Sequence, residues 1–159
     1  MAEEITVSTR IEAPASQVYE MLADMTRIGE WSPEARGITW LGGATGTKVG
    51  ARFKGHNRHG ISRWSTTCEI TAADPGKEIA WDVTFWGMPV ARWTYRIEAD
   101  GADACTVTEH WQDKRAAPMR IIGLATLAGN RAEHNRKGME ETLRRLKAAA
   151  ERSPQSPSR

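Results

Sequence analysis

Cysteine is scarce in this chain, whose 159 residues include only Cys68 and Cys105. The two lie far apart in segments with strand-like alternation, and no Cys-x-x-Cys or Cys/His spacing of the zinc type occurs. A disulfide-rich scaffold and a zinc finger both need several closely spaced ligands, so both are excluded. We expect the two cysteines to be small buried hydrophobic residues, and we expect neither a metal nor a cofactor.

Long apolar runs are also absent, because no uncharged stretch approaches the ~20 apolar residues that a membrane span requires. The first ten residues carry two glutamates and neither a basic nor an apolar leader segment, which predicts a cytoplasmic protein without a secretory signal. With 40% hydrophobic and 26% charged residues, the composition is typical of one soluble domain. We expect this domain over residues 1–152, followed by a disordered tail at 153–159.

Tyrosine and phenylalanine are rare, with two of each, whereas tryptophan occurs seven times. Tryptophan is large and carries one N–H that needs a partner, so it suits partly wet surfaces such as the walls of a pocket. An ordinary core would use more phenylalanine and fewer tryptophans. We therefore expect several of the tryptophans to line a pocket.

Charge is distributed unevenly. Residues 1–113 contain 11 Lys and Arg against 16 Asp and Glu, whereas residues 114–159 contain 11 against 4. A basic helix can bind nucleic acid or an anionic membrane surface, but a basic helix lying on an acidic domain gives the same pattern. No aromatic residue follows Lys114 to stack on bases, so we expect no nucleic-acid partner. A basic-helix module that binds nucleic acid or another protein is a further hypothesis.

Hydrophobic periodicity divides the chain into strands and helices. Alternation over 4–12 indicates a half-buried strand, and two short helical segments follow between Ala13 and Trp31. Turn residues such as Asp74-Pro75-Gly76 then separate short strands, which predicts an antiparallel meander. The expected strands of the meander are 37–41, 51–58, 61–72, 77–85, 90–98 and 104–112.

From Pro118 to Arg152 the apolar period becomes that of a helix with one apolar stripe. The stripe comprises Ile121, Leu124, Ala128, Ala132, Asn135, Met139, Leu143 and Leu146. A twisted sheet of this length curls, and the long helix is the only element large enough to fill its concave side. The sequence therefore predicts an α+β helix-grip fold, in which a seven-stranded curved antiparallel sheet wraps around a long C-terminal helix, with two short helices after the first strand.

Four segments carry a resemblance to a known family: Ala-Asp-Met-Thr-Arg-Ile-Gly-Glu-Trp-Ser-Pro (23–33), Gly-Ala-Arg-Phe-Lys-Gly-His-Asn-Arg (50–58), Arg-Trp-Ser-Thr-Thr-Cys-Glu-Ile (63–70) and Thr-Val-Thr-Glu (106–109). With the element order, they are similar to the SRPBCC or START-like superfamily and, within it, to the actinobacterial polyketide cyclase/dehydrase-like branch. The resemblance covers residues 3–150. It implies a cavity between sheet and helix that binds lipids, sterols, polyketides or plant hormones, with catalysis in some members only.

Three polar residues fall on the predicted apolar face: Asn57, Glu109 and Asn135. Burying each without a partner costs of order 1–3 kcal/mol, so we expect them to hydrogen-bond one another or the polar end of a ligand. Arg131, one helical turn before Asn135, is placed to pair with Glu109. The expected ligand-binding residues are Trp31, Phe53, Asn57, Trp64, Trp81, Trp93, Tyr95, Glu109, Trp111, Leu124, Arg131 and Asn135.

These residues have two interpretations. The tryptophans either fill the core or wall a pocket, and the polar residues either fix the register of the helix or orient a ligand. We expect a protein that binds a hydrophobic small molecule, lipid-like or polyketide-like, between the sheet and the C-terminal helix. The alternative is a polyketide aromatase/cyclase or dehydratase acting in the same cavity, with Glu109 as its base. The sequence leaves open whether a reaction is catalysed and whether the chain forms a homodimer.

Other motifs point to no chemistry. The glycine-rich loop 42–50 lacks the Gly-Lys-Ser/Thr end of a phosphate-binding loop. The resemblance implies instead that this loop borders the mouth of the cavity, with Trp31 as a gate. No serine, histidine and aspartate spacing suggests a nucleophile. We expect all four histidines, His56, His59, His110 and His134, to be exposed.

Overall fold

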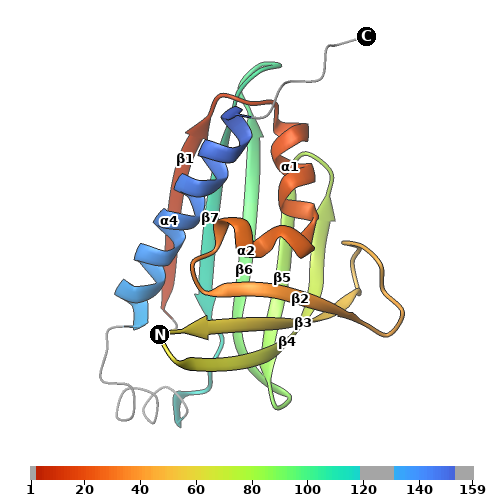
Figure 1. The fold of residues 1–159 in the computed structure, drawn as a ribbon, viewed down its shortest axis with the longest axis vertical. Coiled ribbons are helices and arrows are strands. Elements are labelled where there is room, and N and C mark those ends of the chain that lie inside the picture. Colours follow the sequence, from red (N-terminus) through yellow and green to blue (C-terminus); the bar gives the residue numbers. More distant parts are fainter. Residues whose placement is uncertain (1–2, 119–130, 153–159) are drawn as a thin grey trace.

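The computed structural model describes residues 3–118 and 131–152 and shows one antiparallel sheet in the order β1-β7-β6-β5-β4-β3-β2 (Figure 1). Each strand after β2 pairs with the one before it, as the predicted meander requires, and β1 pairs with β7 at the other edge of the meander. The strands are β1 (Glu4–Ile11), β2 (Ala35–Leu41), β3 (Arg52–His59), β4 (Ser62–Asp74), β5 (Glu78–Phe85), β6 (Met88–Ala99) and β7 (Cys105–Asp113).

Helices cover one face of the curved sheet (Figure 1). The first two helical segments, α1 (Ala15–Ala23) and α2 (Ile28–Trp31), are joined by the 3-10 turn η1 (Met25–Arg27). The long helix α4 (Arg131–Arg152) lies along β1 and also contacts α2. The predicted helix-grip fold is thus confirmed. Residues 119–130, where Ile121, Leu124 and Ala128 fall, and the expected tail at 153–159 lie outside the described residues.

The core lies between the sheet and the helices. One row of side chains crosses four strands, because the register aligns Ile70 with Trp81, Trp81 with Trp93, and Trp93 with Trp111. From α4, Met139, Leu143 and Leu146 are buried against this side. At ~1.5–3 kcal/mol for each large aliphatic side chain, these three contribute as much as the net stability of many domains, ~5–15 kcal/mol. The helix is therefore an integral part of the core.

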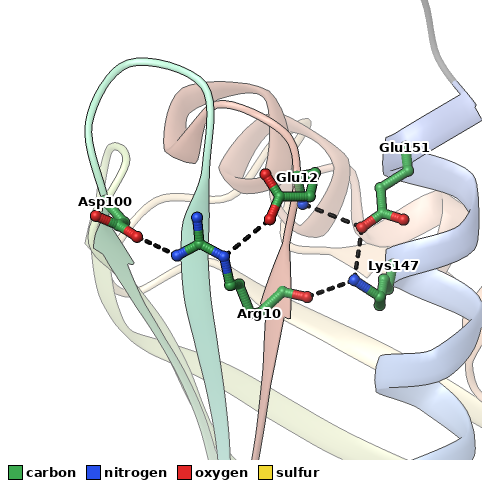
Figure 2. A network of polar contacts seen from close by, with 5 residues as sticks. All are labelled: Arg10, Glu12, Asp100, Lys147 and Glu151. Atoms are coloured by element: carbon green, nitrogen blue, oxygen red, sulfur yellow. Dashed lines mark hydrogen bonds and ion pairs between the residues drawn. The ribbon is translucent and has the colours of Figure 1, made fainter.

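The C-terminal half of α4 is also held by a polar network at one end of the sheet, shown in Figure 2. Lys147 Nζ donates to the Glu151 carboxylate over 2.6 Å and to the Arg10 carbonyl over 2.7 Å. The Glu12 N–H donates to Glu151, and the Arg10 guanidinium pairs with Glu12 and with Asp100. Five residues thus join α4 to β1 and to the β6–β7 turn.

Most turns follow the predicted chemistry, but two were placed wrongly. At Asp74-Pro75-Gly76 the Lys77 N–H donates to the Asp74 carbonyl, and Gly76 has φ 77°. The expected strands 77–85 and 90–98 leave a longer connection, but the turn occupies only Trp86 and Gly87, whose φ angles are 54° and 76°, so β6 already begins at Met88. The expected strands 51–58 and 61–72 likewise place the turn at residues 59 and 60, but it falls on Gly60 and Ile61, because His59 pairs with Ser62. At the β5–β6 turn the error arises because Trp86 occupies a positive-φ position that turns normally give to glycine or asparagine. At the β3–β4 turn Gly60 does occupy the positive-φ position, and the error is a shift of one residue along the chain.

Within the described residues, no helix combines the length and the apolar character that crossing a bilayer would require. Both cysteines are free and buried, as expected.

Candidate functional site

A series of aromatic contacts crosses the concave face of the sheet. Trp40 of β2 meets Phe53 of β3 edge-on, with ring centroids 5.7 Å apart, and Phe53 meets Trp81 of β5 at 6.4 Å. Trp81 in turn stacks on Tyr95 of β6, at 5.7 Å and an interplanar angle of 21°. The strands' alternation places all four rings on the side that faces the helices. They form an apolar wall that ends at the hydroxyl of Tyr95.

A buried carboxyl group terminates this wall. Glu109 of β7 lies directly opposite Tyr95, and the Tyr95 hydroxyl donates to Glu109 Oε1 over 2.7 Å. The Glu109 side chain is 2% exposed, yet its second oxygen, Oε2, has no hydrogen-bond partner among the described residues. In β7 it lies between Val107 and Trp111 on the same face, which explains its burial. An unpartnered buried polar atom is uncommon in native proteins and marks this carboxyl as a candidate functional group.

Burial also changes the acidity of this pair. Loss of hydration raises the pKa of Glu109 to about 8, although the hydrogen bond from Tyr95 opposes the shift. The pKa of Tyr95 also rises well above its usual value, through burial first and then through the neighbouring Glu109 charge. At neutral pH the carboxyl is therefore mostly protonated. While Oε1 accepts from Tyr95, a proton on Oε2 makes this oxygen a donor.

The predicted site residues occupy three environments. Those that are buried are Trp31, Phe53, Trp81, Tyr95, Glu109, Trp111 and Asn135, and those that are half-buried are Asn57, Trp64 and Trp93. Leu124 and the side chain of Arg131 lie outside the described residues. The expected pair of Glu109 with Arg131 therefore also lies outside them. Asn57, Glu109 and Asn135, all within the described part of the chain, form no hydrogen bond with one another. Of the two expected alternatives, hydrogen bonds among these three residues are thus not formed, and Glu109 instead accepts a hydrogen bond from Tyr95.

Two of the predicted residues lie at a cavity away from Glu109. Asn57 and Trp64 face each other across β3 and β4 and line a space of about 490 Å³ together with Arg36, His56, Arg58, Arg63 and Ser65. A second space of about 380 Å³ opens between the start of β1 and the start of α4. Ile5 lines it, and Ile5 is the register partner of Trp111.

Trp31, expected as a gate, is instead 2% exposed and belongs to the core cluster. The Arg27 guanidinium lies 5.0 Å above its ring. The α2 segment contacts both α4 and β2, so a side chain at its end is enclosed rather than free to swing.

The expectation that all histidines are exposed was wrong for three of them. His56 is half-buried because its ring nitrogens lie 2.9 Å from the Thr39 hydroxyl and 3.1 Å from the Ser65 hydroxyl. His110 is half-buried, with its Nε2 3.7 Å from the Glu4 carboxylate, and His134 is half-buried against the ring of His59, with centroids 4.7 Å apart. Only His59 is exposed, and its contact joins the β3–β4 turn to the start of α4.

Sequence reasoning missed one buried charge. Asp113, at the end of β7, is 2% exposed and accepts two hydrogen bonds from the Arg115 guanidinium, of 3.0 and 2.9 Å. The Arg115 N–H donates to the same carboxylate. The signal was present, because Asp113 continues the alternation of Glu109 and Trp111. Its role is to fix the chain as it leaves the sheet.

Neither metal chemistry nor thiol chemistry is suggested by the described residues. Among them no three His, Cys, Asp or Glu side chains are grouped as metal ligands. Burial raises the pKa of Cys68 to about 12, which keeps it as an unreactive thiol. The pair of Tyr95 and Glu109 is thus the strongest candidate for a functional group.

Comparison with known proteins agrees with this architecture. The model of the family described as polyketide cyclase / dehydrase and lipid transport matches residues 2–151. Among curated protein sequences, none is significantly similar to the chain.

Solved structures share the fold. The Polyketide_cyc-like protein Cgl2372 from Corynebacterium glutamicum is 30% identical, with a TM-score of 0.54 over 94% of this chain and 83% of that one. The ginseng major latex-like protein 151 from Panax ginseng has a TM-score of 0.70 at 13% identity, covering 94% of this chain and 97% of that one. A START superfamily protein from Mycobacterium smegmatis has a TM-score of 0.64 at 14% identity, covering 93% and 94%. The last two similarities show the fold alone.

Proposed function

Because the chain belongs to the polyketide cyclase/dehydrase and lipid transport family, and so to the SRPBCC or START-like superfamily, we propose that it binds a hydrophobic small molecule against the aromatic wall. Glu109 Oε2 orients the ligand by donating a hydrogen bond to a carbonyl or hydroxyl oxygen. The observation that carries the proposal is the buried Oε2 without a partner, at the end of the ring series.

The energetics favour a ligand with one acceptor at this position. A buried polar group without a hydrogen bond costs of order 1–3 kcal/mol, which a ligand oxygen would recover on binding. A carboxyl with a pKa of about 8 is a donor at neutral pH, so it favours a ligand group that accepts a hydrogen bond over an ammonium group, which can only donate.

The rest of the ligand would contact aromatic carbon. Trp93 of β6 is half-buried between its register partners, Trp81 of β5 and Trp111 of β7. Tyr95 follows two residues later in the same strand, so the two side chains lie on the same face. Ligand pockets combine such apolar walls with a small number of placed polar groups. A lipid-like or polyketide-like molecule with one internal oxygen meets both requirements.

The second candidate is a polyketide cyclase or dehydratase that acts at the same group. A pKa of about 8 lies close to operating pH, which is the range in which a carboxyl both gives up and takes back a proton effectively. Because the group is mostly protonated at pH 7, Glu109 would begin such a cycle as the acid, whereas the sequence suggested a base.

Ligand binding can be tested with two substitutions of one residue. The side-chain amide introduced by Glu109→Gln can still accept from Tyr95 and donate to a ligand, so affinity for a long-chain methyl ketone should change by at most about tenfold. Glu109→Leu removes the donor, so it should weaken binding of the ketone by about tenfold while leaving the affinity for the alkane of equal length unchanged. Quenching of Trp emission measures both, and Glu69→Gln, an exposed carboxyl on the opposite face of β4, is the matched control.

Turnover separates the two functions. If the site is catalytic, Glu109→Gln should lower the rate with a genuine substrate by about 10²–10⁴-fold while binding stays near that of wild type. Mass spectrometry of molecules that co-purify with the protein supplies candidate ligands. Failure of every apolar probe to bind, together with no co-purifying molecule, would contradict the binding function.

A further inference from the structure

Two hairpin turns lie at the same end of the sheet. In an antiparallel meander alternate turns share an end, which places the β3–β4 turn (Gly60 and Ile61) at the same end as the β5–β6 turn (Trp86 and Gly87) and the last residues of β7. Figure 1 shows both turns in the lower part of the molecule, opposite the end where α4 finishes. We call this the hairpin end.

The hairpin end exposes large apolar side chains. Ile61 is 99% exposed and Trp86 is 86% exposed, while Met88 and Phe85, at the base of the β5–β6 turn, are 43% and 37% exposed. The Phe85 and Trp86 rings contact each other, with centroids 5.9 Å apart. Of the five large hydrophobic residues found exposed in the described part of the chain, only Val49 lies elsewhere. Such concentration of exposed apolar side chains marks an interaction surface.

The fold itself does not require these residues. Trp86 has φ 54° and is the single non-glycine residue with positive φ among those described. Asparagine or glycine is the ordinary choice there, and a bulky residue in that conformation is strained. A tryptophan that is both strained and exposed contributes little to packing, so its benefit must lie outside the folded chain.

Arginines flank the β3–β4 turn. Arg58 and Arg63 lie directly opposite each other, an arrangement of like charges that destabilises a sheet, and Arg36 lines the same 490 Å³ space. Within the described residues none of the three forms an ion pair, and no acidic residue lines that space. The Arg58 Nε–H donates to the Gly60 carbonyl over 3.0 Å, which holds its guanidinium at the turn. This surface is complementary to phosphate groups.

We propose that the hairpin end docks on an anionic lipid bilayer, with Ile61 and Trp86 at the level of the headgroups and Arg36, Arg58 and Arg63 bound to lipid phosphates. Trp favours the membrane interface, and cations beside exposed apolar side chains are the pattern of peripheral membrane binding. The two turn tips can enter a fluid lipid surface without matching pockets in a partner. This inference does not depend on what the interior binds.

Vesicle binding tests the proposal directly. Wild-type protein should sediment with phosphatidylcholine vesicles that contain about 30% phosphatidylglycerol, and less of it should sediment in high salt. Trp86→Asn and Ile61→Ser should each weaken binding by several-fold, and Arg58→Gln with Arg63→Gln by about tenfold or more. The matched controls are Val49→Ser, in the β2–β3 loop at the other end of the sheet, and Arg96→Gln, an exposed arginine of β6, which should bind as wild type does.

A stability measurement separates docking from unfolding. Asparagine tolerates positive φ, so Trp86→Asn should melt at or above the wild-type temperature even though it binds vesicles less well. Brominated lipids should quench wild-type Trp emission more than that of Trp86→Asn. The proposal is overturned if anionic vesicles do not bind the protein, if neutral vesicles bind it equally, or if the hairpin-end variants bind as tightly as the two controls.

Discussion

The two ends of the sheet are built on opposite principles. At the end drawn in Figure 2, which we call the closed end, Arg10, Glu12, Asp100, Lys147 and Glu151 each have a partner of opposite charge, and the network closes α4 onto β1. At the hairpin end, like charges face each other and apolar side chains are exposed. The closed end pairs all five of these charges internally. At the hairpin end Asp113 and Arg115 also pair, but Arg58 and Arg63 of the β3–β4 hairpin face each other and form no ion pair within the described residues. Stability and binding are thus assigned to different ends of the same sheet.

Glu109 lies between these ends and resembles neither. At the closed end, the pKa of Glu151 is lowered, chiefly by the hydrogen bond from Lys147. The pKa of Glu109 is raised because burial removes water and no cation among the described residues replaces it. The difference between the two groups is a cationic partner. Glu151 has one and stays ionised, whereas Glu109 has none in the described part of the chain and keeps its proton.

The largest expected effect comes from titrating Glu109. With a pKa of about 8 in the fold against an ordinary 4.5, the folded chain binds more protons than the unfolded chain between these two values. The contribution of Glu109 to the free energy of unfolding should therefore be fully present below ~4.5 and fall by about 3–5 kcal/mol as pH rises to ~8. Glu109→Gln should remove this slope, as urea titrations at several pH values would show. A wild-type slope that survives in Glu109→Gln would contradict the assignment.

The element order and the strand faces could be predicted from the sequence because alternation is local. Glu109 was placed on the buried face from Val107 and Trp111 alone, and Asp113 continues the same phase. Its bond to Tyr95 could not be predicted, because pairing across β6 and β7 depends on turn lengths and bulges. The turn at Trp86 was misplaced because its residue violates the ordinary preference for glycine or asparagine.

The second prediction concerns what attaches α4 beside the closed end. Leu146 is 0% exposed, one residue before Lys147 of the polar network. Leu146→Ala should lower the free energy of unfolding by about 3 kcal/mol, through lost burial and the cavity left behind. Glu140→Ala, an exposed position of the same helix, is the control and should change stability by less than ~0.5 kcal/mol. Equal effects of the two substitutions in denaturant titrations would show that α4 is not held by its apolar stripe.

The smallest expected effect is that of the ion pair itself. Lys147 and Glu151 are four residues apart, and their side chains remain 38% and 31% exposed. Water screens such a pair, so a double-mutant cycle with Lys147→Ala and Glu151→Ala should give a coupling of only ~0.3–0.5 kcal/mol, and less at a salt concentration of about 1 M. The single change at Lys147 should cost slightly more, because its ammonium also caps the Arg10 carbonyl. Measured at neutral pH, where Glu151 is ionised, a coupling above ~1.5 kcal/mol would mean that the closed end stabilises the fold as strongly as buried apolar contact does, and the contrast between charge and packing drawn from Leu146 would fail.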